Sequence, residues 1–354
     1  MTQIDKTIPP RAKTMVAESA GSERSLVAAE DAQVATHTGW RHRVSTVTSN
    51  VPGPLIGLIA IVIVLSILSP YFLTVTNLLN ILSQMSSIGI MAVGAVLVII
   101  IGGIDLSVGS VVALTSISTG FLYQNAKLPF VLALVIGLAL GALVGLLNGI
   151  LTTVGKLQAF IATLATMSAA AGLALYITGG NPVNGFPDWF QNVTSATVFG
   201  LPLQGLILVA VFLIASFWLR YRPSGRALYA IGGNEEVARL SGLPIRQIKI
   251  AVYVIAGFLA AFAGALITSR LDSAQPTAGT ADLLSVIAVV VIGGASLSGG
   301  SGSMLGTFVG LLVIGVLNNG LSLLNVNPNL QPVVLGAVIV AAVMTDRRAR
   351  KRQH

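Results

Sequence analysis

Long apolar runs follow one another along this chain from Pro54 to about residue 345, separated by short polar or glycine-rich segments. A membrane-spanning helix needs about 17–25 predominantly apolar residues, and ten runs reach or approach that length. The runs cover residues 54–73, 78–101, 104–123, 128–153, 157–178, 201–219, 247–270, 281–297, 303–324 and 330–345. The pattern predicts an all-α, polytopic transmembrane helical bundle with about ten spans.

The two ends of the chain differ from this middle part. Residues 1–50 are polar, of mixed charge and without apolar periodicity, which predicts a disordered cytoplasmic tail. They contain no short apolar core followed by a cleavage site, so we do not expect a secretory signal peptide. The membrane domain is then expected over residues 51–346, followed by a basic cytoplasmic tail over 347–354.

The distribution of basic residues predicts the orientation of the bundle. If the N-terminus is cytoplasmic and each run crosses the membrane, only Lys127 and Arg270 of the 20 basic residues fall outside. The loop over residues 179–200 contains no Lys or Arg and also falls outside. This asymmetry favours cytoplasmic N- and C-termini and an even number of spans, a condition that eight spans would also meet.

Composition excludes several classes of site. The chain is 54% hydrophobic and 9% charged, against about 25% charged residues in soluble domains. It has no cysteine, and His37, His42 and His354 all lie outside the apolar runs, so a histidine relay or a Cys/His metal site in the membrane is not expected. The net charge of +8 comes from the tails and one loop, which favours a membrane protein over a nucleic-acid partner.

One glycine-rich sequence occurs twice. IGGIDLSVGS (101–110) and IGGASLSGGS (292–301) share seven of ten positions, and each follows a strongly apolar run. Transporters often contain internal repeats whose helices break near the substrate pathway. We therefore expect an internal repeat, although two similar cytoplasmic turns would give the same pattern.

Asp105 lies within the first copy, where a carboxylate at the centre of a spanning helix would cost about 2.5–3.5 kcal/mol. The cost falls if Asp105 lies at a helix break and caps backbone N–H groups, with Ser107 nearby. Ser296 occupies the corresponding position of the second copy and is also a good cap. We favour this structural role over a proton site or a contact with cargo.

The fourth apolar run carries glycine at every fourth position. Gly137, Gly141, Gly145 and Gly149 would line one helix face and let another helix backbone approach closely. Ordinary bundle packing is the expected role of this face.

The loop over residues 220–249 contains a short helix signal, NEEVARLSG. Asn234 is a good N-cap, Glu235 and Glu236 occupy the first turn, and Gly242 followed by Pro244 ends the helix. A helix this short is marginal in water by itself, so it is expected to dock, either on a partner or on its own bundle.

This short helix resembles the coupling helix by which permease subunits of ABC importers contact their ATPase subunits. Together with GGIDLSVGS, GLLNG (145–149), FIATLATM (160–167), GGNEEVARLSGLP (232–244), IGGASLSGGSGS (292–303) and GVLNNGL (315–321), it makes the chain similar to the ribose-type sugar permease family. The resemblance runs from about residue 54 to 345. It implies a permease subunit that imports a monosaccharide through a bacterial cytoplasmic (inner) membrane.

The resemblance also implies the partners. These are a second permease copy (a homodimer) or a related permease, two ABC ATPase subunits and a periplasmic sugar-binding protein, in addition to membrane lipid. No cofactor is expected in this chain, since ATP and Mg²⁺ would be bound by the ATPase subunits. The chain has no G-x-x-x-x-G-K-[ST] phosphate loop, because Gly155-Lys156 is followed by Leu157, so it is not expected to be an enzyme.

Three sets of candidate site residues follow. The expected coupling helix uses Asn234, Glu235, Glu236, Ala238, Arg239 and Gly242. The pathway or helix-break candidates are Asp105, Ser107, Asn148, Ser296, Ser298, Asn318 and Asn319. The outer loop would contact the binding protein through Asn181, Asp188 and Trp189. For each asparagine of the pathway set, a hydrogen bond between helices is the structural alternative.

Three other functions remain open at this point. The same architecture could import a branched-chain amino acid or a nucleoside. A secondary transporter could couple to protons through Asp105 or Asp282, because an acid within a membrane is a functional candidate by default. A membrane scaffold without transport activity is the third, which the internal repeat and the broken helices disfavour.

Overall fold

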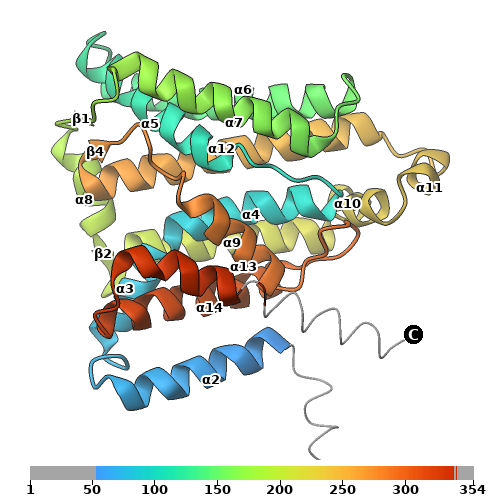
Figure 1. Cartoon of the computed structure of the whole chain (residues 1–354). Helices are drawn as coiled ribbons and strands as arrows, with labels where there is room; N and C mark the ends of the chain where they lie inside the picture. The colour runs from blue at the N-terminus through green and yellow to red at the C-terminus, as the bar shows by residue number, and fades with distance from the viewer. Residues whose placement is uncertain (1–52, 339, 341–354) are drawn as a thin grey trace, which may run out of the picture. The chain divides into compact units, whose positions relative to one another are not determined.

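The helices of this chain form a single bundle, shown in the computed structural model of Figure 1, which describes residues 53–338 and 340. The predicted tails, 1–50 and 347–354, lie outside these residues. The first apolar helices are α2 (Gly53–Leu68), α3 (Val75–Gln84), α4 (Ser86–Ile100) and α5 (Val108–Gln124). They are followed by α6 (Phe130–Thr153), α7 (Ala159–Thr178), α9 (Leu203–Tyr221), α12 (Ile245–Leu271), α13 (Asp282–Ile292) and α14 (Met304–Leu323).

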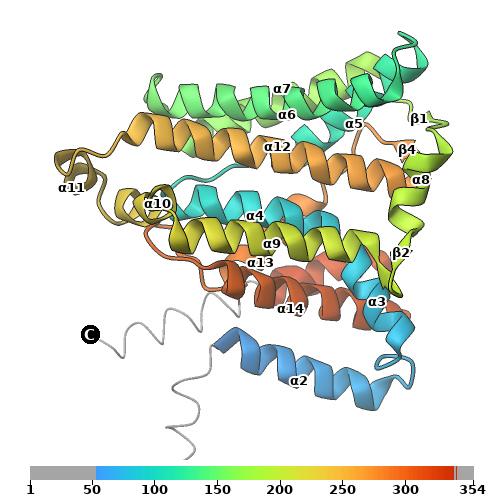
Figure 2. The same ribbon diagram turned by 180° about the vertical axis from the view of Figure 1, so that it is seen from behind.

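Two ends of the bundle can be distinguished in Figures 1 and 2. The short helices α10 (Pro223–Gly233) and α11 (Glu235–Leu240) lie at one end, here called the α11 end. The helix α8 (Asp188–Ser195) lies at the opposite end, here called the α8 end. Two short antiparallel pairs belong to this opposite end, β1 (Val183–Asn184) with β4 (Ser273–Ala274) and β2 (Thr197–Val198) with β3 (Leu201–Pro202).

The glycine face of α6 confirms the predicted close helix packing. A Cβ at Gly141 would lie 2.6 Å from the Gly257 carbonyl oxygen of α12, and one at Gly149 would lie 2.9 Å from Ile250 Cα. Higher residue numbers on α6 meet lower numbers on α12, so the two helices are antiparallel. Gly137 instead meets Thr115 and Thr119 of α5. Small residues allow this backbone approach, which drives helix association in membranes.

Several predicted spans differ from the helices observed. The run 78–101 forms two helices, α3 and α4, that meet at Met85 with a bend of 46°. Thr74 explains why α3 begins where it does, because its hydroxyl accepts a hydrogen bond from Asn77 N at 3.3 Å. The run 281–297 contains only α13, which at about 1.5 Å per residue is too short to cross a bilayer by itself.

The last run, 330–345, is preceded by a 3₁₀ turn, Pro328–Leu330, and is helical over 331–338. Length and composition identify five described helices that could each cross a membrane, or six when the bent pair α3–α4 counts as one. The protein is therefore a multi-pass helical membrane protein, and the count of ten spans stays a prediction.

The segment between α4 and α5 is non-helical and largely buried within the bundle. It returns from the α11 end into the bundle, and Gly103, Asp105 and Ser107 are buried there. Non-helical backbone at membrane depth is tolerated when protein covers it. A hydropathy profile could not separate this segment from the start of the third predicted span at residue 104.

Candidate functional site

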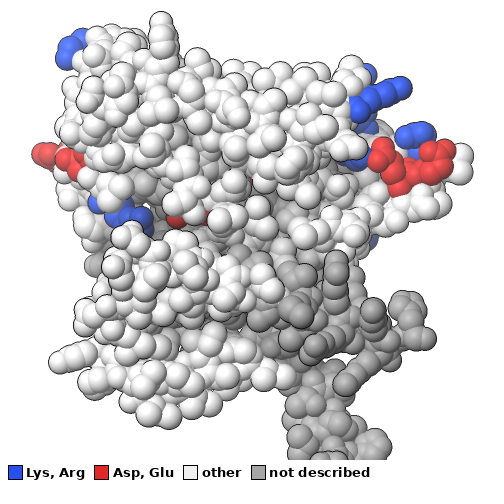
Figure 3. Space-filling model, viewed as in Figure 1, with Lys and Arg blue, Asp and Glu red and all other residues white. Residues whose placement is uncertain are grey.

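The short helix α11 has the cap and charge pattern expected from its sequence. The side chain of Asn234 accepts a hydrogen bond from Val237 N at 3.0 Å. Arg239 forms ion pairs with Glu236 (3.0 Å) and Glu235 (3.7 Å), and Lys249 of α12 pairs with Glu235 at 2.6 Å. Figure 3 shows these opposite charges side by side where α11 projects from the bundle. The charged groups thus fix the helix to α12 and face solvent.

The apolar residues of α11 divide between the bundle and the surface. Ala238 is buried, whereas Leu240 is 81% exposed and Val237 is 57% exposed. Gly242 adopts φ +79°, and Leu243 N donates to the Ala238 carbonyl at 3.2 Å, which closes the helix. The helix therefore docks on its own bundle through one face and offers two apolar side chains on another.

Helix α10 precedes α11 and contacts the interior of the bundle at Gly232. A Cβ at Gly232 would lie 2.5 Å from Gly300 N and would overlap the carbonyl oxygen of Ile100, the last residue of α4. Gly300 N donates a hydrogen bond to this same oxygen at 2.9 Å. We call this contact of Ile100, Gly102, Gly232, Gly299 and Gly300 the glycine junction. It brings the backbones of α10, the α4–α5 segment and the α13–α14 segment into direct contact.

Tyr229 adds a side-chain link beside the glycine junction. Its hydroxyl donates to the Gly302 carbonyl oxygen at 2.9 Å. Burial raises the pKa of the Tyr229 phenol, so the group remains protonated and able to donate at neutral pH. The contacts of Gly232 and Tyr229 therefore hold α10 against the glycine-rich segment between α13 and α14.

The two copies of the repeated sequence have closely related local geometry. The bond from Gly103 N to Val98 O ends α4, and the bond from Ala295 N to Val290 O ends α13 in the same manner. In the first copy, Asp105 Oδ1 accepts from Ser107 N at 2.8 Å. In the second copy, Ser296 Oγ accepts from Ser298 N at 3.4 Å. The copies also meet, since a Cβ at Gly299 would lie 2.9 Å from Gly102 Cα.

The caps of the following helices differ from the expected ones. The N-cap of α5 is Ser107, and its side chain does not cap the helix. The N-cap of α14 is Ser303, whose hydroxyl accepts from Gly306 N at 3.0 Å, and not Ser296. Asp105 and Ser296 lie at helix breaks as expected. Each side chain, however, accepts a hydrogen bond from the backbone N–H two residues later and so stabilises a local turn, and neither caps a helix.

Asp105 begins a chain of buried hydrogen bonds that joins three elements. The Ser107 hydroxyl donates to Asp105 Oδ1 at 2.6 Å, and Asn148 Nδ2 of α6 donates to Ser107 Oγ at 2.9 Å. Thr166 of α7 donates to Asn148 Oδ1 at 2.7 Å. Asn148 is fully buried in the chain. Asn148 therefore makes the interhelical bonds of the structural alternative, to Ser107 and Thr166, whereas the bond of Asp105 stays within its own segment. The pathway role of the three predicted residues remains a prediction.

The remaining pathway candidates are separate from this chain of bonds. Asn319 of α14 and Asn77 of α3 form a reciprocal amide pair with bonds of 2.8 and 2.9 Å, while Asn318 is half-buried. Ser296 is half-buried and Ser298 is exposed near the glycine junction. Asp282 is half-buried at the first residue of α13.

At the α8 end, aromatic side chains hold the loop over residues 179–200 on the bundle. Phe130 of α6 lies 5.5 Å from Trp189 and 4.6 Å from Phe190, measured between ring centroids. Trp189 is nevertheless 52% exposed, and Asn181 and Asp188 are also exposed. The three predicted docking residues therefore lie on an accessible and well-packed surface. Within residues 53–338 and 340, no group of three or more His, Cys, Asp or Glu residues could hold a metal ion.

Sequence reasoning did not single out several residues of these contacts. They are Asn77, Thr166, Tyr229, Gly232 and Gly300. The repeated motif contained Gly300, and the loop motif contained Gly232, but neither motif indicates that they touch. A polar residue within an apolar run was the available signal for Thr166, and a polar residue directly before a run was the signal for Asn77.

A bundle of apolar helices with a buried non-helical segment, and with a short exposed helix at one end, is the architecture of a multi-pass membrane protein. Comparison with known proteins identifies the family. Residues 77–343 match the family described as the branched-chain amino acid transport system / permease component, and the chain belongs to it. The resemblance to ribose-type permeases expected from the motifs is confirmed by relatives that cover most of the chain.

Three curated relatives illustrate this similarity. The ribose import permease protein of Bacillus subtilis (strain 168) is 49% identical over 298 residues, which are 84% of this chain and 92% of the relative. The ribose import permease protein of Escherichia coli (strain K12) is 45% identical over 301 residues, which are 83% and 92% of the two chains. The D-allose transport system permease protein of Escherichia coli (strain K12) is 38% identical over 292 residues, or 82% and 90%. No solved structure matches this chain.

Proposed function

We propose that this chain imports ribose or a closely related monosaccharide as the permease subunit of a binding-protein-dependent ABC importer. The observation that supports the cargo is the 49% identity to a ribose import permease over nearly the whole membrane part. A neutral sugar also suits a membrane domain with few charges, since most of its polar side chains are Asn, Ser and Thr.

The glycine junction supports a route for coupling. α11 would engage an ATPase subunit through Val237 and Leu240, and movement of α11 would pass to α10, which only Asn234 separates from it. At Gly232 the backbone of α10 touches the end of α4 at Ile100 and the α13–α14 segment at Gly300. Displacement of α10 would therefore shift the end of α4 and the α13–α14 segment together and change access at the α11 end.

The topology and assembly follow from this proposal. We infer ten passages with cytoplasmic termini, in which α13 is a shortened passage and the passage through α5 begins with the buried non-helical segment before it. The protein would reside in a bacterial inner membrane with the α11 end in the cytoplasm, because most basic residues of the described part of the chain lie at that end. Two copies would pair, with two ATPase subunits that bind ATP and Mg²⁺. A periplasmic binding protein would contact Asn181, Asp188 and Trp189.

The alternative cargo is a branched-chain amino acid, which the family description names. Uptake by the reconstituted complex of the two permeases, the ATPases and the binding protein would separate these options. Labelled ribose uptake should be inhibited by unlabelled ribose and more weakly by allose, and it should not be inhibited by leucine. Uptake of labelled leucine without uptake of labelled ribose by the same complex would contradict the proposed cargo.

A further inference from the structure

A pocket of about 370 Å³ lies at the α11 end between α9, α10 and the start of α14. Arg220 on the last turn of α9 and Arg226 on α10 line it together with Tyr229. α9 has 19 residues, or roughly 28 Å at 1.5 Å per residue, close to the thickness of the hydrocarbon core. Arg220 is therefore placed where the bilayer meets water, next to the aromatic side chains Trp218 and Tyr221.

The charge of this pocket has no acidic counterpart on the elements that form it. The sequences of α9, α10 and residues 293–310 contain no Asp or Glu. Within the described part of the chain, Glu235 and Glu236 pair with Arg239 and Lys249. Ser303 caps α14 and Tyr229 donates to Gly302, so these neighbouring polar groups already have partners. The guanidinium groups of Arg220 and Arg226 are therefore the groups of this pocket that can donate hydrogen bonds to a ligand.

An apolar track leads from the arginines toward the middle of α9. Ser216 lines the pocket one turn before Arg220, and Leu213, which is 65% exposed, lies almost one turn further along the same face. On the other side, Leu305 of α14 lines the pocket and is 75% exposed. The site thus joins two cations at the water boundary to an apolar surface below them.

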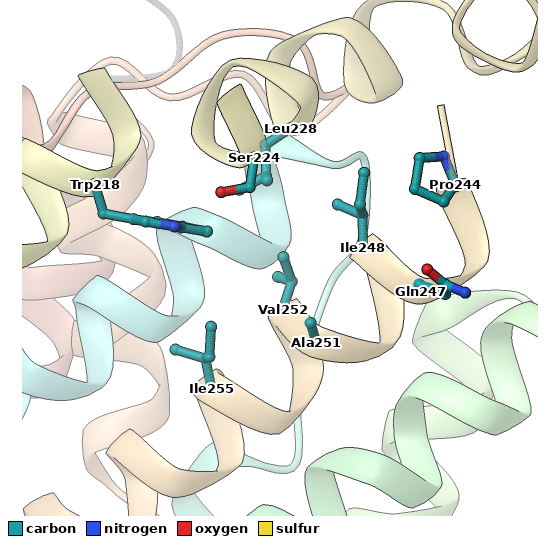
Figure 4. A pocket seen from close by; sticks show the side chains of 9 residues that line it. All are labelled: Trp218, Ser224, Leu228, Pro244, Gln247, Ile248, Ala251, Val252 and Ile255. Atoms are coloured by element: carbon teal, nitrogen blue, oxygen red, sulfur yellow. The ribbon is translucent and has the colours of Figure 1, made fainter. Parts of the chain in front are cut away.

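A second pocket provides a contrast. It has a volume of about 240 Å³ and lies between α9, α10 and α12, as Figure 4 shows, and no charged residue lines it. Trp218, Leu228 and Val252 are among its walls. Such a lining suits an acyl chain but offers no counterion to a headgroup. Charge complementarity distinguishes the arginine pocket from it.

We propose that the arginine pocket binds an anionic phospholipid, with the phosphate between Arg220 and Arg226 and an acyl chain along Leu213 and Leu305. Guanidinium groups bind phosphate oxygens through paired, charge-assisted hydrogen bonds. The bound lipid would join α9 and α10 to the start of α14, beside the glycine junction. This site is separate from cargo recognition and does not depend on which sugar is carried.

The test uses the full chain purified in mild detergent. Wild type, Arg220→Gln/Arg226→Gln and the control Arg222→Gln are titrated with phosphatidylglycerol, phosphatidylcholine or inorganic phosphate, and bound lipid is counted by native mass spectrometry. Arg222 is an exposed neighbour outside the pocket lining. Each basic residue beside an anionic lipid contributes roughly fivefold in affinity. The double variant should therefore bind phosphatidylglycerol about 30-fold more weakly, whereas Arg222→Gln should bind like wild type.

Melting temperature provides the second measurement. Phosphatidylglycerol should raise the melting temperature of wild type and Arg222→Gln, while phosphatidylcholine and inorganic phosphate should raise it little. If inorganic phosphate raises the melting temperature as much as phosphatidylglycerol does, the pocket binds a free anion and the lipid proposal is wrong. If phosphatidylglycerol and phosphatidylcholine bind equally well, the charge of the lipid headgroup has no role and the proposal is also wrong. If the double variant retains phosphatidylglycerol but no longer copurifies with the ATPase subunits, the pocket is a protein contact and the proposal is wrong.

Discussion

Replacing Gly232 by alanine tests whether the glycine junction transmits movement from α11. The added Cβ would lie 2.5 Å from Gly300 N, where ordinary contacts begin at 3.4 Å, and it would overlap the Ile100 carbonyl oxygen. Both neighbours are backbone atoms, so the segments must separate by roughly 1 Å, and overpacking of this kind costs about 1–3 kcal/mol. The separation would also weaken the 2.9 Å hydrogen bond from Gly300 N to Ile100 O.

Gly233 is a matched control in the next position. A Cβ there would have no neighbour within 4 Å, and Gly233 is the last residue of α10. Alanine raises helix propensity at both positions by up to about 1 kcal/mol, so the comparison isolates the collision. If the collision at Gly232→Ala destabilises the conformation described here and not the alternative conformation of the transport cycle, a cost of 1–3 kcal/mol shifts the equilibrium between the two by roughly 5- to 150-fold.

The assay measures ATPase activity stimulated by the binding protein, together with sugar uptake, in the reconstituted complex. Gly232→Ala should assemble with the ATPase subunits, yet uptake per ATP hydrolysed should fall by about fivefold or more. Gly233→Ala should stay within about twofold of wild type. Uptake per ATP hydrolysed that stays at the wild-type level in both variants would refute the role of the junction. An equal loss in both variants would refute it as well.

Three further predictions concern separate contacts. Asn148→Ala should lower the free energy of unfolding by about 1–3 kcal/mol in a detergent melt, because it removes the bonds to Ser107 and Thr166; an unchanged melt would show that these bonds contribute nothing. A double-mutant cycle of Asn77→Ala and Asn319→Ala should give a coupling of about 0.6–1.7 kcal/mol from their reciprocal pair, and additivity would contradict it. Leu240→Asp, at an 81% exposed position, should weaken copurification with the ATPase subunits while leaving membrane insertion intact, and full copurification would exclude Leu240 from that contact.

The sequence was sufficient for features set by local or periodic patterns. The four-residue glycine spacing of α6 predicted a close helix contact, and Asn234, Glu235 and Gly242 predicted the bounds of α11. Family motifs supported the permease assignment, which the comparisons confirm. Each of these signals lies within one helix or one motif, so no knowledge of distant contacts was needed.

Long-range contacts and buried irregular segments could not be predicted in this way. Gly232 and Gly300 touch across nearly seventy residues, and Asn77 pairs with Asn319 across 242 residues. Hydropathy treats the non-helical segment before α5 as part of a span, because residues buried by protein and by lipid are equally apolar. The bend at Met85 has no Pro or Gly beside it in the sequence and is apparent only from the helix geometry.

ATP-dependent uptake of labelled ribose by proteoliposomes tests the central claim most directly. The vesicles contain the two permease copies and the ATPase subunits, and the binding protein is supplied on the outer side. Uptake should require ATP and the binding protein and should be unaffected by an uncoupler. Uptake that proceeds without ATP and is abolished by the uncoupler would contradict the account and would favour a proton-coupled transporter.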